Sequence, residues 1–129
     1  MILDTSFLID YLKGKLHKGA IDKMENVHIA AISCMELYFG ALRFGNKEEQ
    51  EKILLLSSSF AILDFDINAS LEASKIMYDL EKKGSMIDLP DIMIAAIAKA
   101  NNQSIVTRNS KHFSRIEDLK VLDYQKLNN

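Results

Sequence analysis

The first twelve residues, Met1–Leu12, constrain the fold of this chain more than any other stretch. Met1 to Leu3 is a short apolar run typical of a buried strand, and it ends at a carboxylate, Asp4. Thr5 and Ser6 follow, two residue types that often cap helices, and apolar residues then recur at helical spacing. Asp4 is therefore predicted to lie between a strand and a helix, at the edge where ligands bind in open α/β sheets.

The rest of the chain alternates apolar runs with helical patterns. Further strands are predicted at 27–32, 60–65, 104–107 and 121–122, and helices at 19–26, 33–45, 48–59, 68–83 and 92–100. Residues 33–59 read as a helical hairpin, and 108–115 as a polar loop or short helix. Such alternation predicts a three-layer α/β/α fold with a central, mostly parallel sheet. The 129 residues are enough for one domain spanning 1–129.

Several helix ends carry local signals. Ser33 and Glu36 match a capping box, Asn68 or Ser70 is predicted to cap the helix that ends at Gly84, and Pro90 fits a first helical position. In the helix at 68–83, the side chains predicted to face inward are Leu71, Ile76, Met77 and Leu80. The helix at 92–100 is so apolar that it should be buried nearly all round.

Composition excludes few classes of function. The formal net charge of −2 is not that of a dedicated nucleic-acid binder, although bound cations can supply positive charge. A single cysteine, Cys34, allows no intramolecular disulfide and fits a cytoplasmic location. We expect neither a signal peptide nor a membrane span. No glycine pattern suggests a phosphate loop, and His17, His28 and His112 show no metal-ligand spacing.

Three carboxylates occupy equivalent positions after the predicted strands. Asp4 follows the first strand, Glu36 lies in the first turn after the second, and Asp91 lies in the first turn of the buried helix, with Asp88 one turn earlier. In a parallel sheet these positions meet at one edge, where residues 107–109 also arrive. Each carboxylate alone has a structural explanation, because acidic side chains favour helix N-termini, and a cap would explain Asp88.

Together, the carboxylates predict a metal site. Several carboxylates in a partly buried site repel one another, and a divalent cation removes that cost. Oxygen ligands favour Mg²⁺ or Mn²⁺, which can activate water for phosphodiester hydrolysis. Ser6, Thr107 and Asn109 could support the metal or its waters. Arg108 and Lys111 could contact a phosphate backbone, or could simply be solvated charges.

The pattern resembles the PIN-domain family, and most closely the VapC-type toxins of prokaryotic toxin–antitoxin pairs. The matching stretches are I-L-D-T-S-F-L-I-D at 2–10, I-S-C-M-E-L-Y-F-G at 32–40, L-P-D-I-M-I-A-A-I-A at 89–98 and S-I-V-T-R-N-S-K-H-F at 104–113. They are spread over nearly the whole chain, in the family's order and spacing.

The resemblance implies that Asp4, Glu36 and Asp91 are the core acidic residues and that Ser6 and Thr107 are supporting hydroxyls. It places Asn109 at a fourth position where many relatives have Asp. Asn109 keeps an oxygen ligand but removes a charge, which leaves open whether one or two metals bind and whether Asp88 compensates. The resemblance further implies an endoribonuclease toxin that acts on structured RNA, forms a homodimer and is wrapped by a small antitoxin. The aromatic and leucine side chains of the hairpin at 33–59 favour such an interface.

Three alternatives remain open on the residues alone. A phospho-receiver domain needs an acidic pair after the first strand and a lysine after a late one, whereas this chain has only Asp4, and Arg108 follows Thr107. A phosphatase with Asp4 as nucleophile usually has a second acid two residues on, where Ser6 stands. The third alternative, a catalytically weak PIN-fold binding module, is favoured by Asn109.

Overall fold

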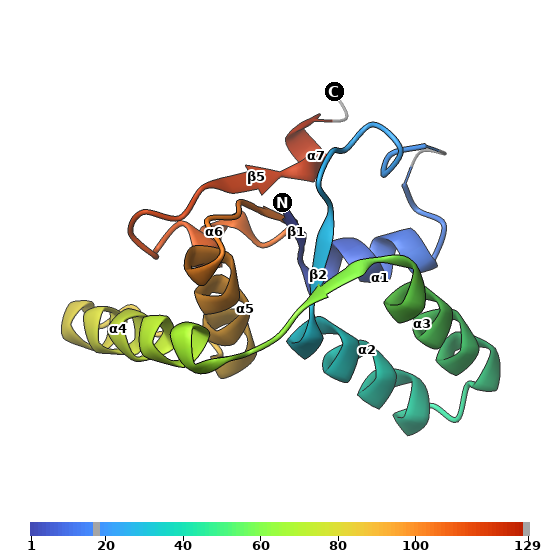
Figure 1. Cartoon of the computed structure of the whole chain (residues 1–129), viewed down its shortest axis with the longest axis horizontal. Coiled ribbons are helices and arrows are strands. Elements are labelled where there is room, and N and C mark those ends of the chain that lie inside the picture. Colours follow the sequence, from blue (N-terminus) through green and yellow to red (C-terminus); the bar gives the residue numbers. More distant parts are fainter. Residues whose placement is uncertain (17–18, 128–129) are drawn as a thin grey trace.

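In the residues that the structure describes, five strands form one parallel sheet (Figure 1). The computed structural model describes residues 1–16 and 19–127. Its strands are β1 (Ile2–Leu3), β2 (His28–Ala30), β3 (Ala61–Leu63), β4 (Ile105–Thr107) and β5 (Val121–Asp123). They are arranged in the order β3-β2-β1-β4-β5, and every pairing is parallel. From β1 the chain adds β2 and β3 on one side, and it later adds β4 and β5 on the other side of β1. The position between β1 and β4 is therefore the topological switch point of the sheet.

Helices cover both faces of this sheet. They are α1 (Thr5–Leu12), α2 (Ala31–Arg43), α3 (Lys47–Ser59), α4 (Ile67–Lys83), α5 (Leu89–Ala100), α6 (Ser110–Phe113) and α7 (Tyr124–Leu127). Figure 1 shows α4 and α5 on one side of the strands and α1, α2 and α3 on the other. The predicted three-layer α/β/α fold is confirmed. In the described parts of the chain, no helix combines the length and the apolar character needed to cross a lipid bilayer.

Side chains alternate between the two faces of the sheet along each strand, and this alternation divides the core into two clusters. Ile2 and Ile105 pack with α4 and α5, whereas their neighbours Leu3 and Val106 pack with α1, α2 and α3. Successive strand residues point to opposite faces, so even a two-residue strand serves both layers. Helix α5 is buried almost all round, as predicted, with Ile94 to Ala98 fully covered. The central position of β1 thus fixes Asp4 at a rigid point of the sheet edge.

Several local predictions were wrong. Residues 19–26 form turns rather than a helix, and the positive φ of Gly19 and Asn26 (81° and 54°) keeps both ends of this segment out of a right-handed helix. His17 lies outside the described residues. On α4 the buried stripe consists of Ala69, Ala73, Ile76 and Leu80, whereas the side chains of Leu71 and Met77 are 57% and 40% exposed.

The N-terminus of α4 also differs from the prediction, since its cap is Asp66. The carboxylate of Asp66 accepts a hydrogen bond from the backbone N–H of Ala69 at 2.9 Å. Replacing Asp66 with alanine is therefore expected to lower the free energy of unfolding by about 1 kcal/mol. The matched variant Asn68→Ala should not lower the free energy of unfolding, because Asn68 is already inside the helix. Urea unfolding of both variants measures the difference, and equal losses would show that Asp66 is not the functional cap.

Candidate active site

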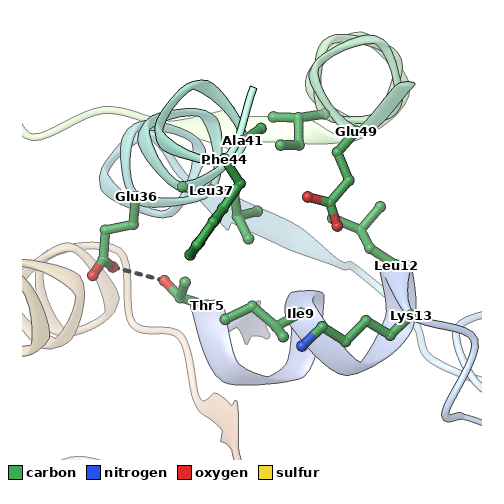
Figure 2. Close-up of a pocket in the computed structure, with 11 residues that line it drawn as sticks. Thr5, Ile9, Leu12, Lys13, Glu36, Leu37, Ala41, Phe44 and Glu49 are labelled. Carbon is green, nitrogen blue, oxygen red and sulfur yellow. Dashed lines mark hydrogen bonds between the residues drawn. The ribbon is translucent and has the colours of Figure 1, made fainter. Parts of the chain in front are cut away.

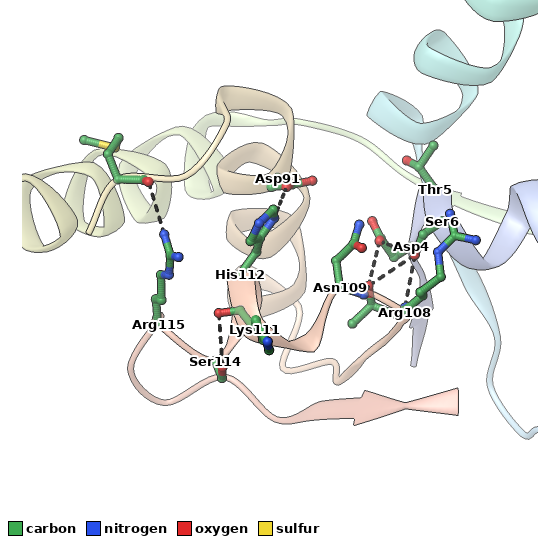
Figure 3. Close-up of polar contacts among 12 residues, drawn as sticks. Asp4, Thr5, Ser6, Asp91, Arg108, Asn109, Lys111, His112, Ser114 and Arg115 are labelled. Carbon is green, nitrogen blue, oxygen red and sulfur yellow. Dashed lines mark hydrogen bonds and ion pairs between the residues drawn. The ribbon is translucent and has the colours of Figure 1, made fainter. Parts of the chain in front are cut away.

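Asp4 is the centre of the candidate site. It follows β1 directly, is only 1% exposed, and lies at the switch point beside β4. Its Oδ2 accepts hydrogen bonds from the hydroxyls of Ser6 (2.9 Å) and Thr107 (2.8 Å) (Figure 3). Its Oδ1 is buried as well, but no described residue donates a hydrogen bond to it. An unpartnered buried carboxylate oxygen is costly, so a cation or a bound water at Oδ1 would be stabilising.

Glu36 reaches the same edge from α2. The helix begins at Ala31, two residues before the predicted start, and Ser33 is buried inside its first turn. The capping box was therefore wrong, because Ser33 is not the N-cap and no side chain caps this end. Glu36 Oε1 instead accepts a hydrogen bond of 2.8 Å from the hydroxyl of Thr5, whose Oγ1 also lies 2.9 Å from Ser33 Oγ. The Glu36 carboxylate is thus hydrogen-bonded to Thr5, which is the first residue of α1 and follows Asp4 in the sequence.

Asp91 comes from the first turn of α5. Its side chain is 19% exposed, and its Oδ2 lies 3.5 Å from Nδ1 of His112 on α6 (Figure 3). That distance is too long for a strong hydrogen bond. Sequence patterns gave no reason to pair His112 with Asp91, since the two are distant in the chain. Asp88 is the N-cap residue of α5, but its side chain makes no cap hydrogen bond, so capping does not explain this carboxylate.

These carboxylates share an electrostatic environment. Burial raises the pKa of Glu36, and repulsion from Asp91, Asp4 and Asp88 raises it further, against the opposing hydrogen bond from Thr5. Burial also raises the pKa of Asp91, with a contribution from the charge of Asp4 that the neighbouring His112 partly offsets. The edge therefore holds more negative charge than the protein alone stabilises.

The donor set at this edge fits a hard divalent cation. Among the residues that the structure describes, no three Asp, Glu, His or Cys side chains are grouped closely enough to enclose one ion. Mg²⁺ does not require such a cage, because it keeps several waters and is usually held by one or two carboxylates. The buried, unpartnered Oδ1 of Asp4 and the repulsion at Glu36 and Asp91 are the two features that a cation would relieve.

The remaining predicted residues lie on the segment after β4. Asn109 is exposed and precedes α6, and its backbone N–H donates to Thr107 Oγ1 at 2.9 Å. Lys111 is exposed on α6. Arg108 is not a free charge: its Nη1 donates to both oxygens of Asp10, at 2.9 and 3.1 Å. Asp10 was not predicted as part of any site.

A metal-free protein should be stabilised by removing one of the repelling charges. In chelator near neutral pH, Asp91→Asn is expected to raise the melting temperature by about 3 °C, equivalent to a little under 1 kcal/mol. The pKa of Asp91 is raised in the folded state, so the folded wild type binds more protons and gains stability as pH falls through that pKa. The difference in stability between variant and wild type should therefore shrink as the pH is lowered from neutral into the acidic range. Calorimetry at neutral and at acidic pH tests this, and a variant no more stable than the wild type at neutral pH would contradict the repulsion.

The chain is similar to proteins of a known family. A model of the PIN domain matches residues 1–119. Ribonuclease VapC1 of Methanocaldococcus jannaschii is 32% identical over 127 residues, which cover 98% of this chain and 88% of the relative. The tRNA(fMet)-specific endonuclease VapC of Salmonella typhimurium is 30% identical over 127 residues, covering 95% of this chain and 96% of the relative.

Solved structures show the same fold. A chain in the crystal structure of VapBC2 from Rickettsia felis, bound to a DNA fragment from their promoter, superposes with a TM-score of 0.83 at 27% identity. The match covers 93% of this chain and 95% of that chain. The family model extends over far more than half of the chain. The chain therefore belongs to the PIN-domain family, and its relatives include the VapC ribonucleases.

Proposed function

We propose that this protein is a metal-dependent endoribonuclease that hydrolyses RNA phosphodiester bonds, as the toxin of a type II toxin–antitoxin pair. The observation that carries the proposal is the buried, unpartnered Oδ1 of Asp4 at the switch point of a PIN-domain sheet, with Glu36 and Asp91 at the same edge. The ribonuclease names of its relatives support the reaction. Solved VapBC structures support an antitoxin partner.

Asp4, together with Glu36 or Asp91, would hold Mg²⁺ or Mn²⁺, and Asp88 and Asn109 would offer further oxygen ligands. When bound, the cation would activate water and stabilise charge on a phosphoryl oxygen. Ser6 and Thr107 hold Asp4 in place through hydrogen bonds to Oδ2, which leaves Oδ1 for the ion. Thr5 holds Glu36 through Oε1, so that Oε2 would accept a proton from the attacking water. Lys111, exposed on α6, would contact the RNA backbone.

The proposal is tested by incubating the purified protein with folded transfer RNA, ribosomal RNA and messenger RNA, in Mg²⁺, in Mn²⁺ and in chelator. We expect new RNA ends with either metal and none in chelator. Cleavage that persists in chelator would contradict the metal dependence. A folded protein that binds these RNAs with metal present but cleaves none of them would favour the binding-module alternative.

Asn109 is expected to limit binding of a second cation. Asn109→Asp adds a negative charge at the edge that carries Asp4, so a second Mn²⁺ should bind about tenfold more tightly, or about 1.4 kcal/mol. Asn102→Asp is the matched control, because Asn102 is also exposed but lies before β4, at the opposite edge of the sheet. Calorimetric titration with Mn²⁺ measures both variants. Unchanged stoichiometry and affinity in Asn109→Asp would count against this role.

The antitoxin would occupy a groove that leads to the site. This groove, of about 360 Å³, lies between α1, α2 and α3 (Figure 2). Ile9, Leu12, Leu37 and Phe44 give it an apolar lining, and Glu36 lies at its end with its hydrogen bond to Thr5. A peptide in this groove would cover the carboxylate edge while burying apolar surface. One docking site would thereby explain both binding and inhibition of the toxin.

We extend the proposal to a homodimer in the cytoplasm. The hairpin of α2 and α3 leaves large apolar side chains exposed, including Phe39 (63%) and Leu55 (68%). Such surface favours contact with another chain. Light scattering on the isolated toxin should give twice the 14.6 kDa mass of one chain, and a mass of one chain at micromolar concentration would contradict the dimer.

A further inference from the structure

Three polar side chains outside the proposed metal site meet beside it. Asp10, on α1, is only 6% exposed. Both of its oxygens accept hydrogen bonds from Nη1 of Arg108, at 2.9 and 3.1 Å, and Oδ2 also accepts one from the hydroxyl of Tyr124. A buried carboxylate is tolerated only when it is paired and hydrogen-bonded. Asp10 meets both conditions, with partners from two segments that are distant in the chain.

This cluster is connected to Asp4 through two backbone amides. The N–H of Arg108 donates to Ser6 Oγ at 3.1 Å, and the N–H of Asn109 donates to Thr107 Oγ1 at 2.9 Å. Since an amide N–H can only donate, each hydroxyl accepts there and has a single proton left to give. Both protons go to Oδ2 of Asp4. The peptide units at 108 and 109 therefore help to hold the two hydroxyls that donate to Oδ2 of Asp4.

Tyr124 completes the connection from the C-terminal segment. Its ring packs edge-on against Phe7, with centroids 4.9 Å apart and planes at 83°, and the residue is 4% exposed. Burial beside Asp10 raises the pKa of Tyr124, so its hydroxyl keeps its proton and remains a donor. Phe7 and Ser6 are neighbours in the first turn of α1, so Tyr124 packs against the helical turn that directly follows Asp4.

We propose that Asp10, Arg108 and Tyr124 are positioning residues, which fix the peptide units after β4 and, through Ser6 and Thr107, fix Asp4 for a divalent cation. This inference rests on the metal site of the proposed function. It reassigns Arg108 from contact with the RNA backbone to holding the Thr107–Asn109 segment, because its Nη1 is committed to a buried carboxylate. The RNA-contact prediction for Arg108 is the competing role.

The first test removes one hydroxyl. Tyr124→Phe keeps the aromatic contact with Phe7 and should fold, whereas it loses the hydrogen bond to Asp10. Removing groups that orient a ligand directly typically lowers metal affinity about 10- to 100-fold, whereas the hydroxyl of Tyr124 acts on Ser6 only through Asp10 and Arg108. We therefore expect calorimetry to show Mn²⁺ binding weakened by about 3- to 10-fold. The matched control is Tyr11→Phe, since Tyr11 is 41% exposed on α1, the helix that carries Asp10, and its Mn²⁺ affinity should equal that of the wild type.

The second test changes the ion pair. Arg108→Lys keeps a cation for Asp10 but loses the planar guanidinium, and Mn²⁺ affinity should fall while the KM for RNA stays the same. Arg43→Lys is the control, because Arg43 is exposed at the end of α2. All titrations are made well below the melting temperature of every variant.

Each alternative gives a distinct pattern. Lower melting temperatures with wild-type Mn²⁺ affinity in Tyr124→Phe and Arg108→Lys would overturn the inference, since the cluster would then only stabilise the fold. A higher KM for RNA with unchanged Mn²⁺ affinity in Arg108→Lys would overturn it in favour of direct RNA contact. If the wild type itself bound no Mn²⁺, the proposed metal site would fail, and the inference with it.

Discussion

Asp4→Asn is expected to lower the rate of RNA cleavage by about 10²- to 10³-fold, the range typical for loss of one preorganised electrostatic group. Asparagine has the same shape and still accepts the hydrogen bonds from Ser6 and Thr107 through one oxygen. Its amide nitrogen would replace Oδ1 and cannot bind a cation. The variant should therefore fold normally and fail in the metal-dependent step.

Asp64→Asn provides the matched control. Asp64 follows β3 at the same edge of the sheet that Asp4 occupies, but it is exposed and comes after an outermost strand instead of the central one. Its replacement should leave the rate of cleavage unchanged. Cleavage by Asp4→Asn at the wild-type rate, on the same RNA and with the same melting temperature, would remove Asp4 from the mechanism. It would also leave the binding-module interpretation as the better one.

Gly40→Leu is expected to weaken antitoxin binding by at least about 100-fold, or about 2.7 kcal/mol, without harming the toxin. Gly40 lies within α2 and lines the groove of Figure 2, and a Cβ added there would meet no atom within 4 Å. A leucine side chain would therefore fill space that the antitoxin needs. The same exchange removes a glycine from a helix interior, which should stabilise the fold by about 0.5–1 kcal/mol.

Gly40→Ala separates these two effects. It should give the same gain in stability, because the helix propensity is improved, with a smaller loss of antitoxin binding. Affinity for the cognate antitoxin and urea unfolding are measured on both variants, with RNA cleavage as the check on the active site. If Gly40→Leu bound the antitoxin as tightly as the wild type, the groove would not be the docking site.

Much of the architecture follows from periodicity in the sequence. The apolar runs and the helical patterns gave the order of strands and helices, because each strand serves a buried sheet and each helix needs an apolar stripe. The position of Asp4 after the first strand predicted the edge of the sheet correctly. The all-parallel order β3-β2-β1-β4-β5 then explains why that edge is a switch point, which the alternation alone did not specify.

Other features depend on contacts between distant segments. The pattern from Ser33 to Glu36 resembles a helix start, but α2 begins earlier, so Glu36 bonds to Thr5 instead of its own helix. The pairing of Asp91 with His112 has no local signal. Asp10 did carry a signal in the sequence, because it is a charged residue close to Phe7 and Leu8 in a helix predicted to pack on the sheet. Such a residue requires a buried partner, although the sequence alone could not name Arg108 or Tyr124.

Asp4 as a metal ligand is tested most directly by a crystal soaked in Mn²⁺ and measured at the manganese absorption edge. We expect an anomalous peak within coordination distance of Oδ1 of Asp4, with Asp91 or Glu36 contributing a second oxygen. A peak only at other sites, from a protein that still cleaves RNA, would contradict the assignment of Asp4 as the metal ligand of this ribonuclease.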